Sequence, residues 1–223
     1  MHLKHYDFKT AVSWLATNFS CNHACYQPPP FSKQDTSIFN PPHRAAGQLD
    51  RVRRYLVQRC IPPACTDALI KSGKLYADHK GNAVFLLLGK KNEAVGAELR
   101  GTGKKRWRGM APGSKKKQGC FYVNRRTFTN VVLCEAAIDA ISYFILYPDC
   151  ITLSTAGVID DHPWISAIIK RGYQVHCGFD SDEIGDHFAM RMMQRHPSIK
   201  RIRPIFHDWN DDLKMRYNTQ NPS

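Results

Sequence analysis

Three acidic residues follow two short apolar stretches in the second half of the chain. Residues 131–134 are followed by Glu135, and residues 175–179 are followed by Asp180 and Asp182. Each stretch is typical of a short buried strand that leads into a helix. Because an open α/β sheet binds its ligands at the carboxyl ends of its strands, we expect these carboxylates at one rim. Together they favour a shared divalent metal that faces phosphate.

Mg²⁺, or Mn²⁺ in its place, takes a few carboxylates together with water and substrate phosphate. Asp180 and Asp182 could reach one ion if their segment leaves the strand as a loop. Glu135 would complete this site or act as a general acid or base on a hydroxyl group. A bound ion could then stabilise the charge of a phosphoryl displacement. Asp208 and Asp211 are outer candidates. The alternative is that these are surface acids at helix N-termini, where the helix dipole favours them.

Strand-like and helix-like stretches alternate four times from residue 128 onward. The pattern predicts an α/β fold with a mostly parallel sheet, right-handed crossovers and helices on both faces. Beyond the two strands that precede the acids, strands are predicted at residues 151–154 and 201–206, and residues 208–212 are expected to form a loop.

Three segments resemble the Toprim domain of bacterial primases, type IA and II topoisomerases and OLD-type nucleases. They are Leu133-Cys134-Glu135-Ala136-Ala137-Ile138-Asp139-Ala140, Phe179-Asp180-Ser181-Asp182-Glu183-Ile184-Gly185 and, as in primase-like members, Asp208-Trp209-Asn210-Asp211-Asp212-Leu213. The family has a strand-ending Glu and a strand-ending Asp-x-Asp, and this chain departs from it in having Ala136 where Gly is usual. The resemblance implies a Rossmann-like Toprim fold over about the last hundred residues. It also implies catalytic roles for Glu135, Asp180 and Asp182, and metal binding by these three and Asp208.

Residues 49–127 are expected to form a small basic α+β domain. Helices are predicted at residues 50–59 and 65–72, and antiparallel strands at 75–77, 83–88, 94–100 and 119–123. This order resembles a poorly characterised domain that often precedes Toprim in mobile-element proteins. We therefore divide the chain into residues 1–48, 49–127 and 128–223, the last being the catalytic domain.

Positive charge is concentrated in the first part of the chain. Residues 1–127 hold 23 Lys and Arg against 7 Asp and Glu, whereas residues 128–223 hold 9 against 12. Basic side chains pair with phosphates without reading sequence, and Trp107 could stack on a base or anchor its loop to the sheet. The alternative is a solvated basic surface. The candidate nucleic-acid-binding residues are Lys104, Lys105, Arg106, Trp107, Arg108, Lys115, Lys116, Lys117, Arg125 and Arg126.

Residues 1–48 are expected to form a helix and a Pro-rich linker. The helix is expected over residues 5–20, and its residues 7–16 are similar to the helix that closes the zinc ribbon of bacterial primases, but the ribbon is missing. This suggests the remainder of a longer ancestor or one product of a split gene. Cys21, His23 and Cys25 have no second ligand pair at zinc-finger spacing, so ordinary thiols are expected.

Several function classes lack support in the sequence. There is no P-loop motif, no nucleophile-elbow Ser and no apolar run near the roughly 20 residues of a membrane span. A reduced, cytoplasmic protein is expected.

Three functions remain open. The first is primase-like nucleotidyl transfer, with nucleic acid (DNA favoured over RNA) and nucleotides as partners and no protein partner assigned. The second is a metal-dependent nuclease or nickase of the same fold. The third is a non-catalytic nucleic-acid-binding accessory protein of a mobile element.

Overall fold

The computed structural model of the protein describes residues 38–104, 107–125, 128–158 and 161–220. The chain divides into two units, residues 1–36 and 37–223, and the fold described below is that of the second. The predicted N-terminal helix and the Cys21, His23 and Cys25 segment lie outside the described residues.

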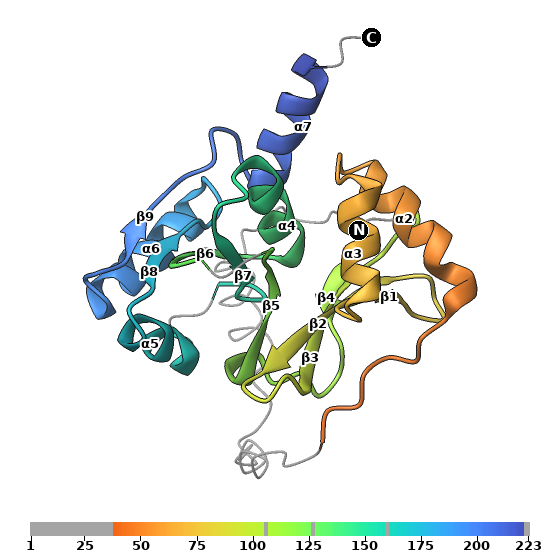
Figure 1. The fold of residues 1–223 in the computed structure, drawn as a ribbon, viewed down its shortest axis with the longest axis horizontal. Coiled ribbons are helices and arrows are strands. Elements are labelled where there is room, and N and C mark those ends of the chain that lie inside the picture. The colour runs from red at the N-terminus through yellow and green to blue at the C-terminus, as the bar shows by residue number, and fades with distance from the viewer. Residues whose placement is uncertain (1–37, 105–106, 126–127, 159–160, 221–223) are drawn as a thin grey trace, which may run out of the picture. The chain divides into compact units, whose positions relative to one another are not determined.

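One nine-stranded sheet forms the centre of this unit, in the order β4-β3-β2-β5-β7-β6-β8-β9, with β1 paired to β2 (Figure 1). The strands of its antiparallel half are β1 (Leu75–Ala77), β2 (Ala83–Gly89), β3 (Ala94–Arg100), β4 (Arg108–Met110) and β5 (Gly119–Val123). The strands of its parallel half are β6 (Asn130–Cys134), β7 (Ile151–Ser154), β8 (Gln174–Cys177) and β9 (Lys200–Arg201). The predicted fold class, an α/β fold with a smaller α+β part before it, is confirmed.

The two halves meet where β5 pairs antiparallel with β7. Phe121, Tyr122 and Val123 face Ser154, Leu153 and Thr152 across this pair. Both sequence segments therefore contribute to one sheet, and the boundary between residues 127 and 128 stays a prediction.

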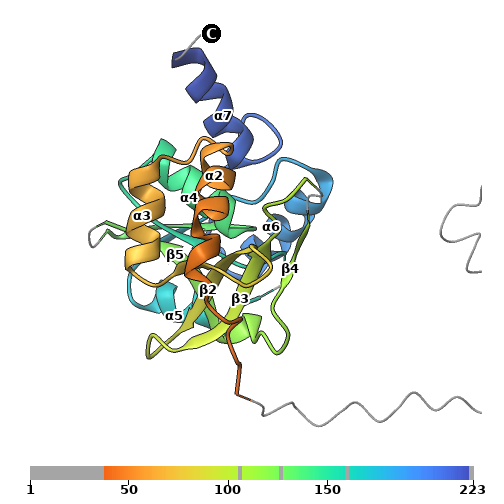
Figure 2. The ribbon, with the colours of Figure 1, turned by 90° about the vertical axis from the view of Figure 1, so that its right-hand side faces the viewer.

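Helices cover both faces of the parallel half (Figures 1 and 2). Side chains alternate along β6, so Val132 and Cys134 pack on one face and Val131 and Leu133 on the other. On the first face, α4 (Ala137–Leu146) and α7 (Trp209–Gln220) cover the parallel half. α2 (Leu49–Val57) and α3 (Pro63–Lys71) belong to the same core but pack beside β1 of the antiparallel half. The second face is covered by α5 (Pro163–Lys170) and α6 (Glu183–Arg195). Two short 3₁₀ helices, η1 (Ala46–Gln48) and η2 (Lys116–Gln118), complete the elements.

Two predictions near the C-terminal end are wrong in extent. The strand predicted at residues 201–206 is only β9, and the loop predicted at 208–212 is mostly the first turn of α7. Pro204 has no N–H to donate to a ladder. The Asp212 carboxylate accepts hydrogen bonds from the N–H groups of Ile205 (2.9 Å) and Phe206 (2.8 Å), which fixes them in a turn.

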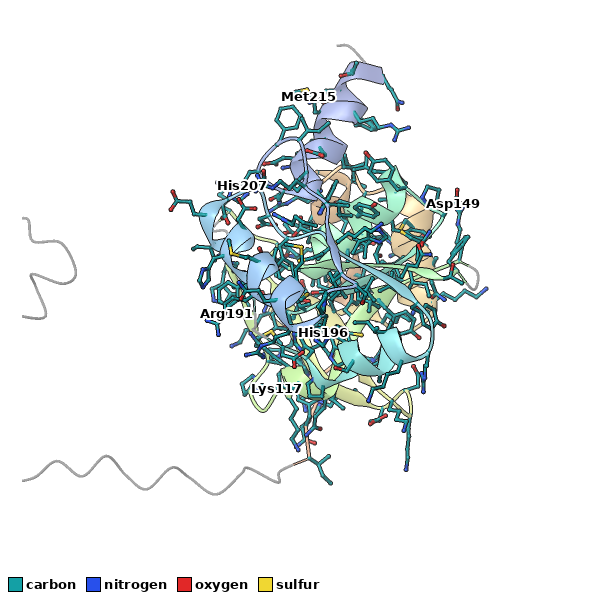
Figure 3. The ribbon with its side chains drawn as sticks, turned by 90° about the vertical axis from the view of Figure 1, so that its left-hand side faces the viewer. Lys117, Asp149, Arg191, His196, His207 and Met215 are labelled. Carbon is teal, nitrogen blue, oxygen red and sulfur yellow. The ribbon has the colours of Figure 1, made fainter. Side chains whose placement is uncertain are left out.

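The end of α7 extends away from the sheet, and Met215 there is 49% exposed (Figure 3). Among the described residues, no helix has both the length and the apolar character that crossing a membrane requires.

Candidate active site

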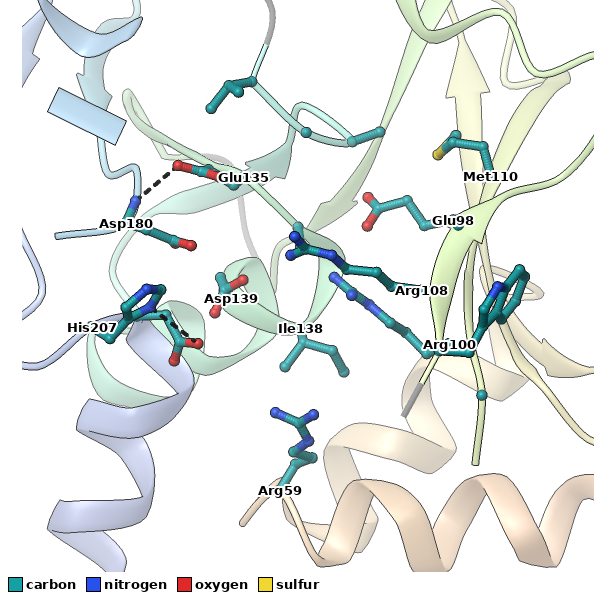
Figure 4. Close-up of a pocket in the computed structure, with 18 of the residues that line it drawn as sticks. Arg59, Glu98, Arg100, Arg108, Met110, Glu135, Ile138, Asp139, Asp180 and His207 are labelled. Atoms are coloured by element: carbon teal, nitrogen blue, oxygen red, sulfur yellow. Dashed lines mark hydrogen bonds and ion pairs between the residues drawn. The ribbon is translucent and has the colours of Figure 1, made fainter. Parts of the chain in front are cut away.

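Glu135 and Asp180 lie side by side at the carboxyl ends of β6 and β8. These strands are parallel neighbours, so the residues that follow them leave the sheet at the same rim. The N–H of Asp180 donates a hydrogen bond to Glu135 Oε1 at 3.2 Å (Figure 4). Between Glu135 and α4, Ala136 has an extended backbone (φ −135°, ψ 161°) that any residue adopts. The chain therefore needs no Gly at this position.

Asp182 caps the N-terminus of α6. Its Oδ1 accepts a hydrogen bond from the N–H of Gly185 at 2.7 Å, and its Oδ2 takes no part in this cap. Gly185 allows the close approach of this turn to Asp180, because a Cβ on Gly185 would lie 2.3 Å from the Asp180 carbonyl oxygen. The Asp-x-Asp spacing thus places one carboxylate after the strand and one on the helix cap.

Arg201 holds the segment that carries Asp180. Its guanidinium donates to the carbonyl oxygens of Cys177 (3.3 Å), Phe179 (2.8 Å) and Asp180 (2.8 Å), and to Asp186 Oδ1 at 3.1 Å. On the opposite side, the Trp209 indole donates to the Gly178 carbonyl at 2.7 Å. The backbone between β8 and α6 is therefore fixed from two directions.

His207 lies between two further acids. Its Nε2 is 3.6 Å from Asp182 Oδ2, and its Nδ1 is 4.0 Å from Asp208 Oδ2. Asp208 also accepts from the N–H of Asp211 at 2.7 Å, at the start of α7. Asp211 itself forms an ion pair with Lys214 at 2.8 Å and is not among the residues that line the cleft described below.

Asp139 belongs to this cluster, although residue types alone did not single it out. It lies in the first turn of α4, is 7% exposed, and its Oδ1 has no hydrogen-bond partner. The helix α4 starts two residues after Glu135, and helical side chains point back toward the helix N-terminus, so Asp139, four positions after Glu135 and in the first turn, lies toward the same rim. That spacing is the signal that could have identified it. We call Glu135, Asp139, Asp180, Asp182 and Asp208 the acidic rim.

Burial, and then the charges of neighbouring acids, raise the pKa of Glu135, Asp139 and Asp180. Burial, then the charges of Glu135 and Asp208, raise the pKa of Asp180 to about 7. Burial also raises the pKa of Glu135, and the Asp182 charge adds to this shift. The pKa of Asp139 is raised well above its usual value by burial and then by Asp208 and Asp180. Carboxylates in this arrangement are stabilised by a nearby cation.

The donor set fits a hard divalent ion such as Mg²⁺ or Mn²⁺. Asp139 Oδ1 and Asp180 Oδ1 are buried and have no partner, and both belong to the oxygen type that these ions bind. Within the described ranges, no three His, Cys, Asp or Glu side chains form a ready-made metal cage. Mg²⁺ usually keeps several waters and takes only one or two carboxylates.

The acidic rim forms one wall of a cleft of about 890 Å³. The other wall carries Arg59, Arg100, Arg108 and Lys116, and the side chains of Arg100 and Arg108 point toward the acids (Figure 4). Carboxylates and guanidinium groups thus face one another across a space large enough for a drug-sized ligand.

The predicted nucleic-acid-binding residues fall into three groups. Trp107, Arg108 and Lys116 line the cleft. Lys104, Lys115, Lys117 and Arg125 are described but are not among its lining residues. Lys105, Arg106 and Arg126 lie outside the described residues.

One of the described basic residues, Arg125, lies away from the acids. Arg125 follows the end of β5 that lies beside the start of β7, at the opposite end of the sheet from the acidic rim. Arg125 is therefore not part of this cleft.

Arg59 and Arg100 were not among the predicted site residues. Asn210 fixes Arg59: its Nδ2 donates to the Arg59 carbonyl at 2.9 Å, and its Oδ1 accepts from Arg59 Nη1 at 3.1 Å. Arg100 ends β3, two residues after Glu98, which also lines the cleft. Their i, i+2 spacing places both on one face of the strand and was the available signal.

Comparison with known families gives two matches. Residues 132–213 match the Toprim-like family, and residues 54–124 match a family described as a protein of unknown function, DUF3991. A curated relative, the 65 kDa protein of Zymomonas mobilis, is 29% identical over 252 residues, covering 97% of this chain and 41% of the relative. The chain thus spans less than half the length of this relative.

Similar solved structures include catalytic parts of primases. The primase fragment of the bacteriophage T7 primase-helicase has a TM-score of 0.51 and 14% identity, covering 70% of this chain and 67% of that one. The RNA polymerase domain of Mycobacterium tuberculosis primase DnaG has a TM-score of 0.53 and 12% identity, covering 78% and 76%. A DnaG catalytic domain bound to single-stranded DNA gives 0.51 and 13%, covering 75% and 70%. At these identities the likeness concerns the fold.

Proposed function

Because the chain carries a Toprim-like domain preceded by a DUF3991 domain, we propose that it transfers nucleotides onto a growing chain on a DNA template, with Mg²⁺ or Mn²⁺. The observation that carries this proposal is the cleft in which the acidic rim faces Arg59, Arg100, Arg108 and Lys116. Such a cleft can hold metal on one wall and phosphate on the other. The primase catalytic parts of similar fold support the choice of reaction.

Asp180 and Asp182 would hold the ion, with Asp139 and Asp208 nearby. A bound ion supplies positive charge that stabilises the charge developing in phosphoryl displacement. Arg100 and Arg108 would bind phosphate oxygens, since guanidinium groups donate two parallel hydrogen bonds to them. Glu135, whose pKa is raised by burial, is suited to take the proton of an attacking hydroxyl near neutral pH.

The test is oligonucleotide synthesis from labelled nucleotides on a single-stranded template. With Mg²⁺ or Mn²⁺ the protein should make short oligomers, and Asp180→Ala should reduce their yield at least about 1000-fold, because one ligand and one buried charge of the site are removed. Asp149→Ala removes an exposed acid on the loop between α4 and β7 and should leave the yield unchanged.

Other results of this experiment would contradict the proposal. No oligomers with either metal, from folded protein, would exclude nucleotide transfer on that template. Shortening of the template with the same dependence on Asp180 would indicate a nuclease instead. In a separate Mn²⁺ titration, no binding to wild type, or binding that Glu135→Ala and Asp180→Ala leave unchanged, would indicate a non-catalytic binding protein.

Trp107 offers a stacking surface for a base at the mouth of the cleft. It is 47% exposed, and its ring packs over Gly109, where a Cβ would lie 2.9 Å from Cζ2. The side chain is thus both anchored on the β3–β4 hairpin and partly open to ligand. Trp107→Ala should weaken binding of a 12-nucleotide single strand about 5- to 50-fold, within the range known for base stacking on aromatic side chains.

Fluorescence anisotropy at fixed salt would measure this effect. Trp107→Phe should retain most of the affinity, and Met215→Ala, which removes another exposed apolar side chain, should have no effect. Arg108→Ala should lower the slope of log affinity against log salt by about one, as expected for one lost phosphate contact. Unchanged binding by Trp107→Ala would mean that this Trp serves only to anchor its hairpin.

A further inference from the structure

Glu98 is a buried carboxylate that the proposed chemistry does not use. It lies on β3 in the antiparallel half, is 4% exposed and lines the cleft. Its Oε2 accepts a hydrogen bond from the N–H of Ala137 at 3.0 Å, and its Oε1 accepts one from the Ser154 hydroxyl. Ala137 begins α4 and Ser154 ends β7, so both partners belong to the parallel half.

These two bonds reach the backbone around Glu135. Ser154 Oγ accepts from the N–H of Ala156 at 3.0 Å, and the N–H of Gly157 donates to the Glu135 carbonyl at 2.7 Å. Ala156 and Gly157 have φ of +55° and +99°, and the Ala conformation is one that L-residues adopt only when their surroundings impose it. The Glu98 carboxylate thus closes a network that holds the loops after β6 and β7 together.

Glu98 also fixes the start of α4. Its carboxylate lies at the first N–H of the helix, where the helix dipole favours negative charge and no intrahelical acceptor exists. Glu135 lies two residues before Ala137 and Asp139 two residues after it. A shift of this helix start would therefore move two acids of the rim at once.

We propose that Glu98 is a positioning residue of the candidate active site, through which the antiparallel half holds Glu135 and Asp139 at the acidic rim. This gives the segment matched by DUF3991 a defined task besides binding phosphate. The consequence for catalysis rests on the proposed nucleotide transfer. The consequence for the backbone of α4 does not.

Hydrogen exchange followed by NMR tests the backbone directly, in the full chain. In Glu98→Ala the Ala137 and Ala156 amides should exchange at least tenfold faster than in wild type, because the first loses its acceptor and the second loses the restraint on Ser154. In Ser154→Ala the Ala156 amide should also exchange at least tenfold faster than in wild type. Glu98→Gln keeps an acceptor for Ala137 and should stay within about threefold of wild type. Glu93→Ala, an exposed Glu in the β2–β3 turn, is the matched control.

Kinetics tests the catalytic consequence. Glu98→Ala should lower kcat for oligomer synthesis about 30- to 100-fold with KM changed less than threefold, because small displacements of reacting groups cost rate more than binding. Glu98→Gln should recover kcat to within about fivefold of wild type. If the substitutions only reduced the amount of folded protein, the concentration of active sites would fall. The kcat for each folded molecule would then stay at the wild-type value.

The exchange and kinetic measurements distinguish failure of the proposed function from failure of the proposed role of Glu98. If wild type makes no oligomers, the proposed function fails and the exchange rates alone decide whether Glu98 positions α4. Wild-type exchange at Ala137 in Glu98→Ala overturns the proposal. If Glu98→Ala does not fold, Ser154→Ala and Glu98→Gln decide: wild-type exchange at Ala156 in the first, or Ala137 exchange tenfold faster in the second, overturns it.

Discussion

Asp180→Asn is expected to abolish nucleotide transfer and, in the absence of metal, to make the protein more stable at pH 8. The reason for both effects is the same carboxylate. Its Oδ1 is buried without a partner, and its pKa is raised to about 7, first by burial and then by Glu135 and Asp208. The substitution by Asn removes the negative charge that would bind the metal. It also removes a buried charge that destabilises the fold when no metal is present.

The sign of the pH effect follows from proton linkage. The usual pKa of an Asp is 3.8 and the folded protein raises it to about 7, so the folded state binds the proton more tightly than the unfolded state. Asp180 therefore lowers the stability of the metal-free protein progressively as pH rises from about 4 to about 7, and by a constant amount above that. Asp180→Asn should gain about 1–3 kcal/mol at pH 8, allowing for partial solvent screening, and almost nothing at pH 4.

Urea unfolding of both proteins at pH 4 and pH 8, with EDTA and with Mg²⁺, would measure this. Mg²⁺ should stabilise wild type and leave Asp180→Asn unchanged, since only wild type has the full set of ligands. Asp149→Asn, at an exposed position, should follow wild type throughout. Equal stability of wild type and Asp180→Asn at pH 8 without metal would mean that Asp180 carries no unfavourable charge in the fold.

Gly185→Ala is expected to cost about 2–4 kcal/mol of stability and about 100-fold in rate. A Cβ at this position would lie 2.3 Å from the Asp180 carbonyl oxygen, which is backbone and held by Arg201 Nη2 at 2.8 Å. The added Cβ cannot be accommodated by a side-chain movement, because the Asp180 carbonyl belongs to the backbone. The first turn of α6 and the Asp180 segment must separate, and Asp182 moves with the helix that it caps.

Thermal unfolding and the oligomer assay would show this loss. A protein of this size loses about 2–4 °C of Tm for each kcal/mol. Gly47→Ala is the control, because nothing lies within 4 Å of a Cβ at Gly47. If Gly185→Ala melted like wild type, the close approach of α6 to Asp180 would be dispensable.

The sequence patterns predict most of the sheet because its strands are apolar runs bounded by turn residues. The segment 75–77 and the segment 94–100 agree with β1 and β3 to the residue. α7 was missed because residues 209–220 have no apolar stripe: only the first part, with Trp209 and Leu213, packs on the core. Its start depends on Asp208, whose carboxylate accepts from the N–H of Asp211.

The same contrast holds at the site. The meeting of Glu135 and Asp180 could be predicted, because the carboxyl ends of neighbouring parallel strands share one rim. The positions of Glu98 and Arg100 could not, because they depend on how β3 is placed relative to β7 through the pairings of β2 and β5. Sequence periodicity shows which face of a strand a residue occupies but not which distant residues it faces.

The pairing of β5 with β7 has a consequence for how such a protein can be taken apart. Cleavage after residue 127 would leave Phe121, Tyr122 and Val123 on one fragment and Thr152, Leu153 and Ser154 on the other, each with unsatisfied backbone donors and acceptors. Recombination that exchanges the C-terminal piece would have to supply a substitute for β7 that pairs with β5 at the same register. The two segments therefore depend on each other to complete this part of the sheet.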